Sequence, residues 1–238
     1  MASTLAPTTR DLDEYRQMRG RMSRFINRLV DDIPKRAWFE VTEALGLDPD
    51  GVTANDHVYN IVADCCFFDW FDENRRNVVE RYADRHRPRR GSDESIVLDA
   101  YLQAEYRILY PQSIVPSAGM YCRDDLNQKE LFLIDLALSR NQDFKKVIYA
   151  VRTIPFGAYW ISTSAGIPVR VNGSKAAVHE FRKMNRDWPD NLSRSVLLIR
   201  RFLAGSSGFV VMSYEDPSLT WRDPLRAPRR AAADSLHG

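Results

Sequence analysis

The clearest structural signal lies in two stretches, which read PQSIVPSAGMYCRDDLNQKELFLIDL at residues 111–136 and KVIYAVRTIPFGAYWISTSAGIPVRV at residues 146–171. Short runs rich in β-branched and aromatic residues alternate there with the glycine, proline, asparagine and aspartate that are typical of turns. The runs predict five strands, at Pro111–Gly119, Met120–Asp125, Glu130–Leu136, Lys146–Ile154 and Tyr159–Val171. Because the turns are short, sequence neighbours can pair, and we expect a closed or nearly closed antiparallel β unit.

Upstream of residue 111, apolar residues recur at the helical spacing of three and four. The pattern predicts helices at 11–29, 34–45, 55–72, 77–85 and 92–110. Asp11 and Glu14 offer a capping-box variant at the start, and Gly46 suits the position after the second helix. The fifth helix is apolar on most sides, so we expect it to lie in the common core.

Helical periodicity returns after residue 174. The sequence therefore predicts an α+β protein with an N-terminal helical bundle, a small five-stranded antiparallel barrel-like β unit and C-terminal helices. The expected parts are a helical region at 1–110, the β unit at 111–173, the C-terminal helices at 174–204 and an extended tail at 205–238.

Composition is that of an ordinary globular protein. Of the 238 residues, 44% are hydrophobic and 28% are charged, and a net charge of +2 excludes a strongly basic nucleic-acid binder. No apolar run approaches the roughly 18 residues of a membrane-spanning helix, and the N-terminus lacks the features of a signal peptide. Three cysteines, two of them adjacent, do not form a secreted disulfide framework. We therefore expect a cytoplasmic protein that is not associated with a membrane.

The strongest candidate for a metal site is the group His57, Asp64, Cys65, Cys66 and Asp69. Zinc ligands are spaced so that their side chains converge, whereas adjacent cysteines on a helix point about 100° apart. We therefore expect Cys65 and Cys66 to be buried, reduced thiols, and we expect no metal and no cofactor.

The sequence predicts no catalytic residue. The chain has no Gly-x-Ser-x-Gly elbow and no glycine-rich phosphate loop, and its four histidines are scattered. The run Gly205–Gly208 fits a turn better than a nucleophile elbow. Asp69, Asp72 and Glu73 lie within one turn, but carboxylates followed by arginines more often form a solvated, ion-paired face. An enzyme of unrecognised type stays open, because active sites need no sequence motif.

The most suggestive feature is the basic segment Arg75–Arg90, in which seven arginines stand against two acids. Guanidinium groups bind phosphate and stack on bases, which indicates RNA or another polyanion as a partner. The predicted binding residues are Arg75, Arg76, Tyr82, Arg85, Arg87, Arg89 and Arg90. A second basic cluster lies between residues 182 and 201.

Two considerations bear on this basic segment. The chain uses 28 arginines and only 6 lysines, and genome composition would produce the same bias without any selected site. The loop Arg85–Gly91 should nevertheless be exposed, because Pro88 ends the preceding helix and unpaired guanidinium groups are costly to bury.

A resemblance covers residues 60–171. The run Phe67-Phe-Asp-Trp70, the run Val79-Glu-Arg-Tyr82 and the run Glu105–Tyr110 precede a small β unit that contains Glu130–Asp135. This order resembles a poorly characterised bacterial region that precedes C-terminal SEC-C zinc motifs. No cysteine follows Cys122, so the zinc motif itself is missing and the resemblance implies architecture without a zinc role.

Three functional hypotheses follow. The leading one is a non-catalytic interaction module for a macromolecular partner, most simply a protein, because Tyr149, Phe156, Tyr159 and Trp160 cluster in the β region and aromatic residues are enriched at interfaces. Aromatic residues in strands more often belong to the core. The alternatives are RNA or polyanion binding through Arg75–Arg90 and an enzyme of unrecognised type.

Overall fold

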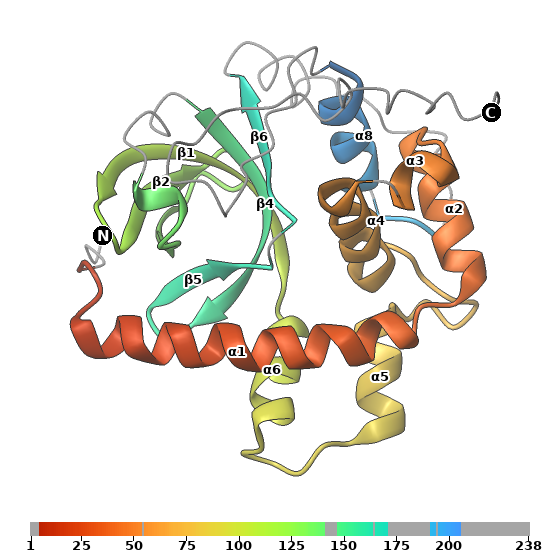
Figure 1. Cartoon of the computed structure of the whole chain (residues 1–238), viewed down its shortest axis with the longest axis horizontal. Coiled ribbons are helices and arrows are strands. Elements are labelled where there is room, and N and C mark those ends of the chain that lie inside the picture. The colour runs from red at the N-terminus through yellow and green to blue at the C-terminus, as the bar shows by residue number, and fades with distance from the viewer. Residues whose placement is uncertain are drawn as a thin grey trace, which may run out of the picture.

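The computed structural model describes residues 5–53, 55–140, 147–163, 165–170, 191–193 and 195–205 (Figure 1). The helices are α1 (Thr9–Asp31), α2 (Lys35–Leu45), α3 (Pro49–Thr53), α4 (Asp56–Phe68), α5 (Val78–His86), α6 (Asp93–Tyr101), the short 3-10 helix η1 (Leu138–Arg140) and α8 (Ser195–Gly205). The strands are β1 (Glu105–Val115), β2 (Gly119–Asp124), β3 (Glu130–Ile134), β4 (Val147–Phe156), β5 (Tyr159–Ser162) and β6 (Ile167–Arg170).

Five of the strands close into a small barrel. They pair in the order β1-β2-β3-β5-β4, and β1 also pairs with β4, which completes the ring. The sixth strand, β6, pairs with β4 outside the ring. The α+β class with a small five-stranded barrel is therefore confirmed, and the closed order is that of the Greek-key barrels called OB-folds.

Two details of the barrel differ from the expectation. The ring is mixed, because β3 and β5 run parallel while its other pairs are antiparallel. The fifth predicted strand, Tyr159–Val171, is interrupted after Ser162 and resumes at Ile167, so that β5 and β6 pair with different halves of β4. At the break, Thr163 still donates its amide to Arg152 O.

The boundary between helices and barrel also differs. The predicted helix 92–110 ends at Tyr101, and β1 begins at Glu105, so the helical part stops before the expected residue 110. Both faces of β1 are covered: Ile108 packs against the helical core, and Leu109 belongs to the barrel interior. A strand buried on both faces is apolar throughout, and its periodicity does not distinguish it from a buried helix.

The other helices form where the pattern placed them, with local differences. The capping box of α1 uses Thr8 and Asp11, one turn before the predicted pair. Gly46 adopts φ 71° at the end of α2, as its position predicted. The run Asp48-Pro-Asp-Gly51 has the composition of a turn, but the helix α3 begins within it, at Pro49.

Helix α1 joins the two halves of the molecule, because it runs beneath the barrel and on past the helices (Figure 1). Helix α4 stands between the barrel and the outer helix α2 in Figure 1, and nine of its residues are buried. The predicted helix that begins at residue 174 and the tail after residue 205 lie outside the described residues. The seam between α1, α4 and the barrel is where a cavity remains.

Candidate ligand-binding cleft

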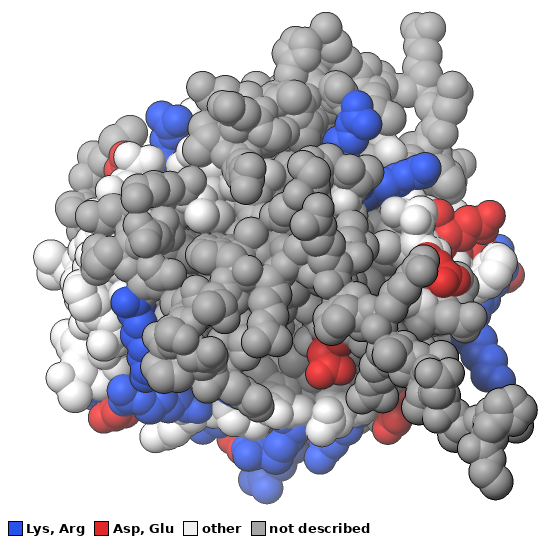
Figure 2. Space-filling view, turned by 45° about the horizontal axis from the view of Figure 1, so that its top comes forward, with Lys and Arg blue, Asp and Glu red and all other residues white. Residues whose placement is uncertain are grey.

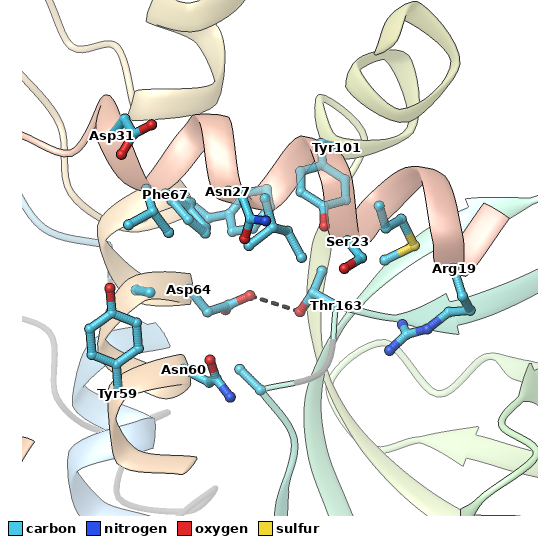
Figure 3. Close-up of a pocket in the computed structure, with 16 residues that line it drawn as sticks. Arg19, Ser23, Asn27, Asp31, Tyr59, Asn60, Asp64, Phe67, Tyr101 and Thr163 are labelled. Atoms are coloured by element: carbon cyan, nitrogen blue, oxygen red, sulfur yellow. Dashed lines mark hydrogen bonds between the residues drawn. The ribbon is translucent and has the colours of Figure 1, made fainter. Parts of the chain in front are cut away.

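A cavity of about 600 Å³ lies between α1 and α4, and it is closed at one end by α6 and by the segment after β5 (Figure 3). This volume lies within the range of sites that bind small molecules. The cleft is lined by apolar and polar side chains together. They are Arg19, Met22, Ser23, Ile26, Asn27, Val30, Asp31, Tyr59, Asn60, Ala63, Asp64, Phe67, Phe68, Tyr101, Thr163 and Ala165.

The helical repeat explains how α1 and α4 supply these side chains. On α1 the polar members recur every four residues, at Arg19, Ser23, Asn27 and Asp31. On α4, Asn60 and Asp64 have the same spacing. Residues four apart lie on one face of a helix, so each helix presents a polar row along the cleft.

At Asp64, the floor of the cleft adjoins a buried ion cluster. Arg152 on β4 donates from Nε to Asp64 Oδ2 at 2.8 Å, and its Nη2 donates to Asp69 Oδ2. The guanidinium also lies 4.6 Å from the centre of the Phe68 ring. Two carboxylates therefore share one cation in a place with almost no solvent contact.

Hydrogen bonds from neutral groups support both carboxylates. Thr163 donates from Oγ1 to Asp64 Oδ1 at 2.7 Å, which is the bond drawn in Figure 3. Ser195 donates to Asp69 Oδ1 at 2.5 Å, and thereby ties α8 to the same cluster. The break between β5 and β6 is what brings Thr163 within reach of Asp64.

Burial and charge shift the pKa values of this cluster in opposite directions. Burial raises the pKa of the Asp64 carboxyl, although the charge of Arg152 works against the rise. Burial alone would lower the pKa of Arg152, but the charges of Asp69 and Asp64 outweigh it and raise that pKa. Arg152 therefore stays a cation, and the cluster carries more negative than positive charge when both carboxyls are ionised.

The hydroxyl of Tyr101 is the unusual polar group of the cleft. Tyr101 is 2% exposed, and its Oη has no hydrogen-bond partner among the described residues. The ring is held by Phe25 and Phe68, with ring centres 5.4 and 5.6 Å away. In Figure 3 the hydroxyl points into the cavity. Burial raises the pKa of this phenol, so it stays protonated near neutral pH and is a hydrogen-bond donor.

Sequence reasoning placed the binding residues elsewhere, in the segment Arg75–Arg90. Part of that segment is engaged in the fold: Arg76 pairs with Asp84, and Arg85 pairs with Asp32 at 2.8 Å. Arg75 adopts φ 61° in the turn after Asp72. Arg76 and Arg85 therefore form ion pairs within the helical half of the molecule.

Tyr82 is also part of the fold. Its side chain is buried, its hydroxyl donates to Glu94 at 2.5 Å, and its ring stacks on His86 at 4.1 Å. It therefore offers no exposed ring on which a base could stack.

The remaining predicted residues lie in the loop after α5. Arg87 ends the helix with φ 39°, and Arg87, Arg89 and Arg90 are exposed. The predicted exposure of this loop is confirmed. Across the described part of the face in Figure 2, basic side chains are dispersed and acidic ones lie among them.

The other candidate groups separate in space. Cys65 and Cys66 are buried and free, as predicted, and burial raises the pKa of both thiols. In the described ranges, no group of three or more histidine, cysteine, aspartate or glutamate side chains is placed to hold a metal ion. Of the three carboxylates near residue 70, Asp69 joins the ion cluster, whereas Asp72 accepts backbone amides of Asn74 and Arg76. His179, His237, the cluster 182–186 and Arg194 lie outside the described residues.

The aromatic residues of the β region are mostly internal. Tyr149 is buried in the barrel, and Trp160 lies under the guanidinium of Arg107 at 4.1 Å. Phe156 and Tyr159 are half-buried against α1, where Tyr15 and Asp11 contact them.

The sequence contained one usable signal for the cleft. The four-residue polar repeat on α1 runs beside its apolar stripe, but such a row is normally a solvated helix face. Tyr101 and Thr163 come from distant segments and carry no local signal.

Within the described part of the chain, no helix combines the length and apolar character needed to cross a membrane. A family model described as "Family of unknown function (DUF7986)" matches residues 9–193, which include helices α1 to α6, the barrel and the whole cleft. No curated protein and no solved structure matches the chain. The family match does not concern SEC-C motifs, so that resemblance stays a prediction.

Proposed function

The chain belongs to the DUF7986 family, whose function is unknown, and we propose that it binds a small molecule in the cleft between α1, α4 and the barrel. The observation that carries this proposal is the Tyr101 hydroxyl, which is buried, aimed into the cavity and without a partner among the described residues. A buried polar group left unsatisfied costs about 1–3 kcal/mol, and the cost disappears when a ligand supplies the partner. Sites for small molecules are usually preformed clefts that combine apolar surface with a few convergent polar groups.

The cleft supports a small ligand better than the β region supports a macromolecular partner. A protein partner was expected from Tyr149, Phe156, Tyr159 and Trp160, but their rings are buried or half-buried. The cleft, in contrast, has a free volume of about 600 Å³ and polar groups on each of the four segments that line it.

The proposal is tested by capture from a small-molecule extract. Purified protein is incubated with the fraction of a bacterial extract below about 1 kDa, desalted and analysed by native mass spectrometry. We expect the wild type to retain a species that Ser23→Trp, which fills the cleft from α1, does not retain. Tyr101→Phe should retain less of it.

A matched control exists in Tyr106→Phe. The Tyr106 hydroxyl is also buried without a partner among the described residues, but Tyr106 does not line the cleft. This variant should capture as the wild type does. If the wild type retains nothing, or if Ser23→Trp retains the same species, the cleft is not a binding site.

A second candidate function is polyanion binding at the loop after α5. The observation that favours it is the exposure of Arg87, Arg89 and Arg90 together, in the loop that follows the end of α5. In OB-folds, oligonucleotides bind over strands 2 and 3 and between the β1–β2 and β4–β5 loops. Here those loops are the tight turns 116–118 and 157–158, so the arginine loop is the better-supported place for RNA.

We also propose a reducing compartment such as the cytoplasm. The support is that Cys65, Cys66 and Cys122 are all buried as free thiols, which is usual where disulfides do not form.

A further inference from the structure

We propose that the ligand of the cleft is recognised through a vicinal diol, as carried by a sugar ring or by the ribose of a nucleoside. This inference rests on the proposed function and concerns the chemistry of the same site. It follows from the hydrogen bonds that the lining groups of the cleft can still form.

The floor requires donors from the ligand. Asp64, when ionised, only accepts hydrogen bonds, and its two oxygens already accept one bond each from Arg152 and Thr163. A carboxylate has about four lone-pair positions, so it accepts further bonds. Because Thr163 donates its single hydroxyl proton to Asp64, its oxygen can only accept a hydrogen bond from a ligand.

Other groups of the cleft require acceptors. The Tyr101 hydroxyl is a donor without an acceptor among the described residues. The amides of Asn27 and Asn60 each carry two N–H donors and one carbonyl acceptor. In Figure 3 these amides extend from opposite helices into the same space as Asp64.

A hydroxyl group is the simplest ligand group that both donates and accepts. Two adjacent hydroxyls would donate to Asp64 and Thr163 while their oxygens accept from Tyr101 and Asn60. An ammonium donates only, and a phosphate or carboxylate accepts only. The hydrogen-bonding pattern of the cleft therefore matches a diol.

Neither ionic alternative satisfies the cleft. An anion would lie against Asp64, in a cluster where two buried carboxylates share Arg152. An ammonium would be attracted to Asp64, but it has no acceptor for the Tyr101 hydroxyl and would leave that donor unsatisfied. A neutral polyhydroxylated ligand avoids the repulsion of an anion by Asp64 and still offers acceptors to Tyr101. The apolar surfaces of Phe67 and Phe68 suit the C–H face of a sugar or a nucleobase.

The experiment repeats the extract capture after periodate treatment. Periodate cleaves the carbon–carbon bond of vicinal diols, so we expect the captured species to disappear from the treated extract. Extract that received periodate already quenched with ethylene glycol should behave as the untreated extract. Survival of the captured species through active periodate overturns the diol and leaves the proposed function standing. Capture of nothing from any extract overturns the proposed function itself.

Two defined probes separate the sources of the diol. Displacement of the captured species by maltose indicates a sugar, and displacement by adenosine indicates a nucleoside. Adenosine is compared with 2′,3′-dideoxyadenosine, which lacks the diol. If the nucleoside is the source, loss of the diol should weaken displacement by about tenfold or more; equal displacement would overturn recognition through the diol.

Variants show whether the named groups bind the ligand directly. Tyr101→Phe and Asn60→Ala should each weaken binding by about tenfold, whereas the matched Tyr106→Phe should leave it unchanged. Equal weakening by Tyr106→Phe would mean that Tyr101 acts only through the fold, and it would overturn the proposed hydrogen bond.

Discussion

Arg107 and Arg152 are two buried arginines of the same barrel, and each contacts two carboxylates. Arg107 lies over one aromatic ring, whereas Arg152 lies over two, those of Phe68 and Tyr106. Arg107 lies inside the barrel, where it binds Asp124 and Glu105 and covers Trp160. Arg152 lies on the outer face of β4, at the seam with α4. Both guanidinium groups therefore contact carboxylates and aromatic rings, but the carboxylates of the two sites differ in their exposure to water.

The difference lies in where the second carboxylate is placed. Inside the barrel, the Glu105 side chain is 54% exposed, so the excess negative charge at that site is in water. At the seam, the side chains of Asp64 and Asp69 are 7% and 2% exposed, so the excess charge is buried. A buried excess charge needs additional hydrogen-bond donors. At the seam, Thr163 donates to Asp64 and Ser195 donates to Asp69. Asp64 also lines a cavity in which a ligand can donate further hydrogen bonds.

The largest expected effect is that of Arg152→Met. It removes the cation and leaves two buried carboxylates facing each other, so the free energy of unfolding should fall by about 4 kcal/mol or more. Urea denaturation followed by circular dichroism measures the loss. Arg152→Lys keeps the charge and should lose less. If Arg152→Met is as stable as the wild type, the seam cluster does not hold α4 against the barrel.

Arg107→Met should cost less, about 3 kcal/mol, because it leaves one buried carboxylate, Asp124, without its cation. A second substitution sharpens the comparison. Asp124→Asn added to Arg107→Met neutralises that carboxylate, while the amide oxygen can still accept from Leu126 N, so much of the stability should return. Asp64→Asn added to Arg152→Met should restore less, because Asp69 remains. Equal restoration in both double variants would contradict the difference drawn between the sites.

The comparison also predicts a pH dependence. Burial raises the pKa of Asp64, so the folded state binds a proton there more readily than the unfolded chain does. The resulting stabilisation is complete below the ordinary value of 3.8 and is lost as the pH rises through the raised pKa. Asp64→Asn has no such titration.

The measurement compares unfolding free energies of the wild type and Asp64→Asn across the acidic range. The stability of the wild type minus that of the variant should decrease as the pH rises from about 3.8 towards neutral. A difference that grows with pH would mean that the Arg152 charge outweighs burial and lowers the pKa of Asp64.

Sequence reasoning works where one face of an element is exposed. The apolar stripe of α1 and the turn residue Gly46 predicted local structure correctly. The start of β1 was missed because Ile108 and Leu109 are both fully buried, on opposite faces of the strand. Nothing local indicates that β3 and β5 pair in parallel, since that pairing depends on how the ring closes.

The cleft was harder to predict because it is made of four separate segments. Asp64 was considered only as a metal ligand, whereas its partners Arg152 and Thr163 are 88 and 99 residues away in the chain. In the sequence, nothing distinguishes Tyr101 from an ordinary core residue. Its missing hydrogen bond is visible only in the structure. The basic segment was conspicuous in sequence, but Asp32 and Asp84 already bind part of it.

The smallest expected effect on stability is at the arginine loop. Replacing Arg87, Arg89 and Arg90 together with serine should change the free energy of unfolding by no more than about 0.5 kcal/mol, because the three side chains are exposed. If the loop binds polyanions, the same variant should bind poly(U) RNA more weakly. The plot of log affinity against log salt concentration should flatten by about 0.7 for each RNA phosphate that the variant no longer neutralises.

A matched triple variant decides whether the loop or the overall charge is responsible. Arg10, Arg16 and Arg36 are also exposed, and each is already paired with an acid one turn away on its own helix. Replacing these three with serine changes the net charge by the same amount. Unchanged RNA binding in this control, together with weaker binding in the loop variant, would locate the RNA site at residues 87–90. Equal weakening in both would mean that RNA responds only to net charge, and the cleft would remain the binding site that the structure supports.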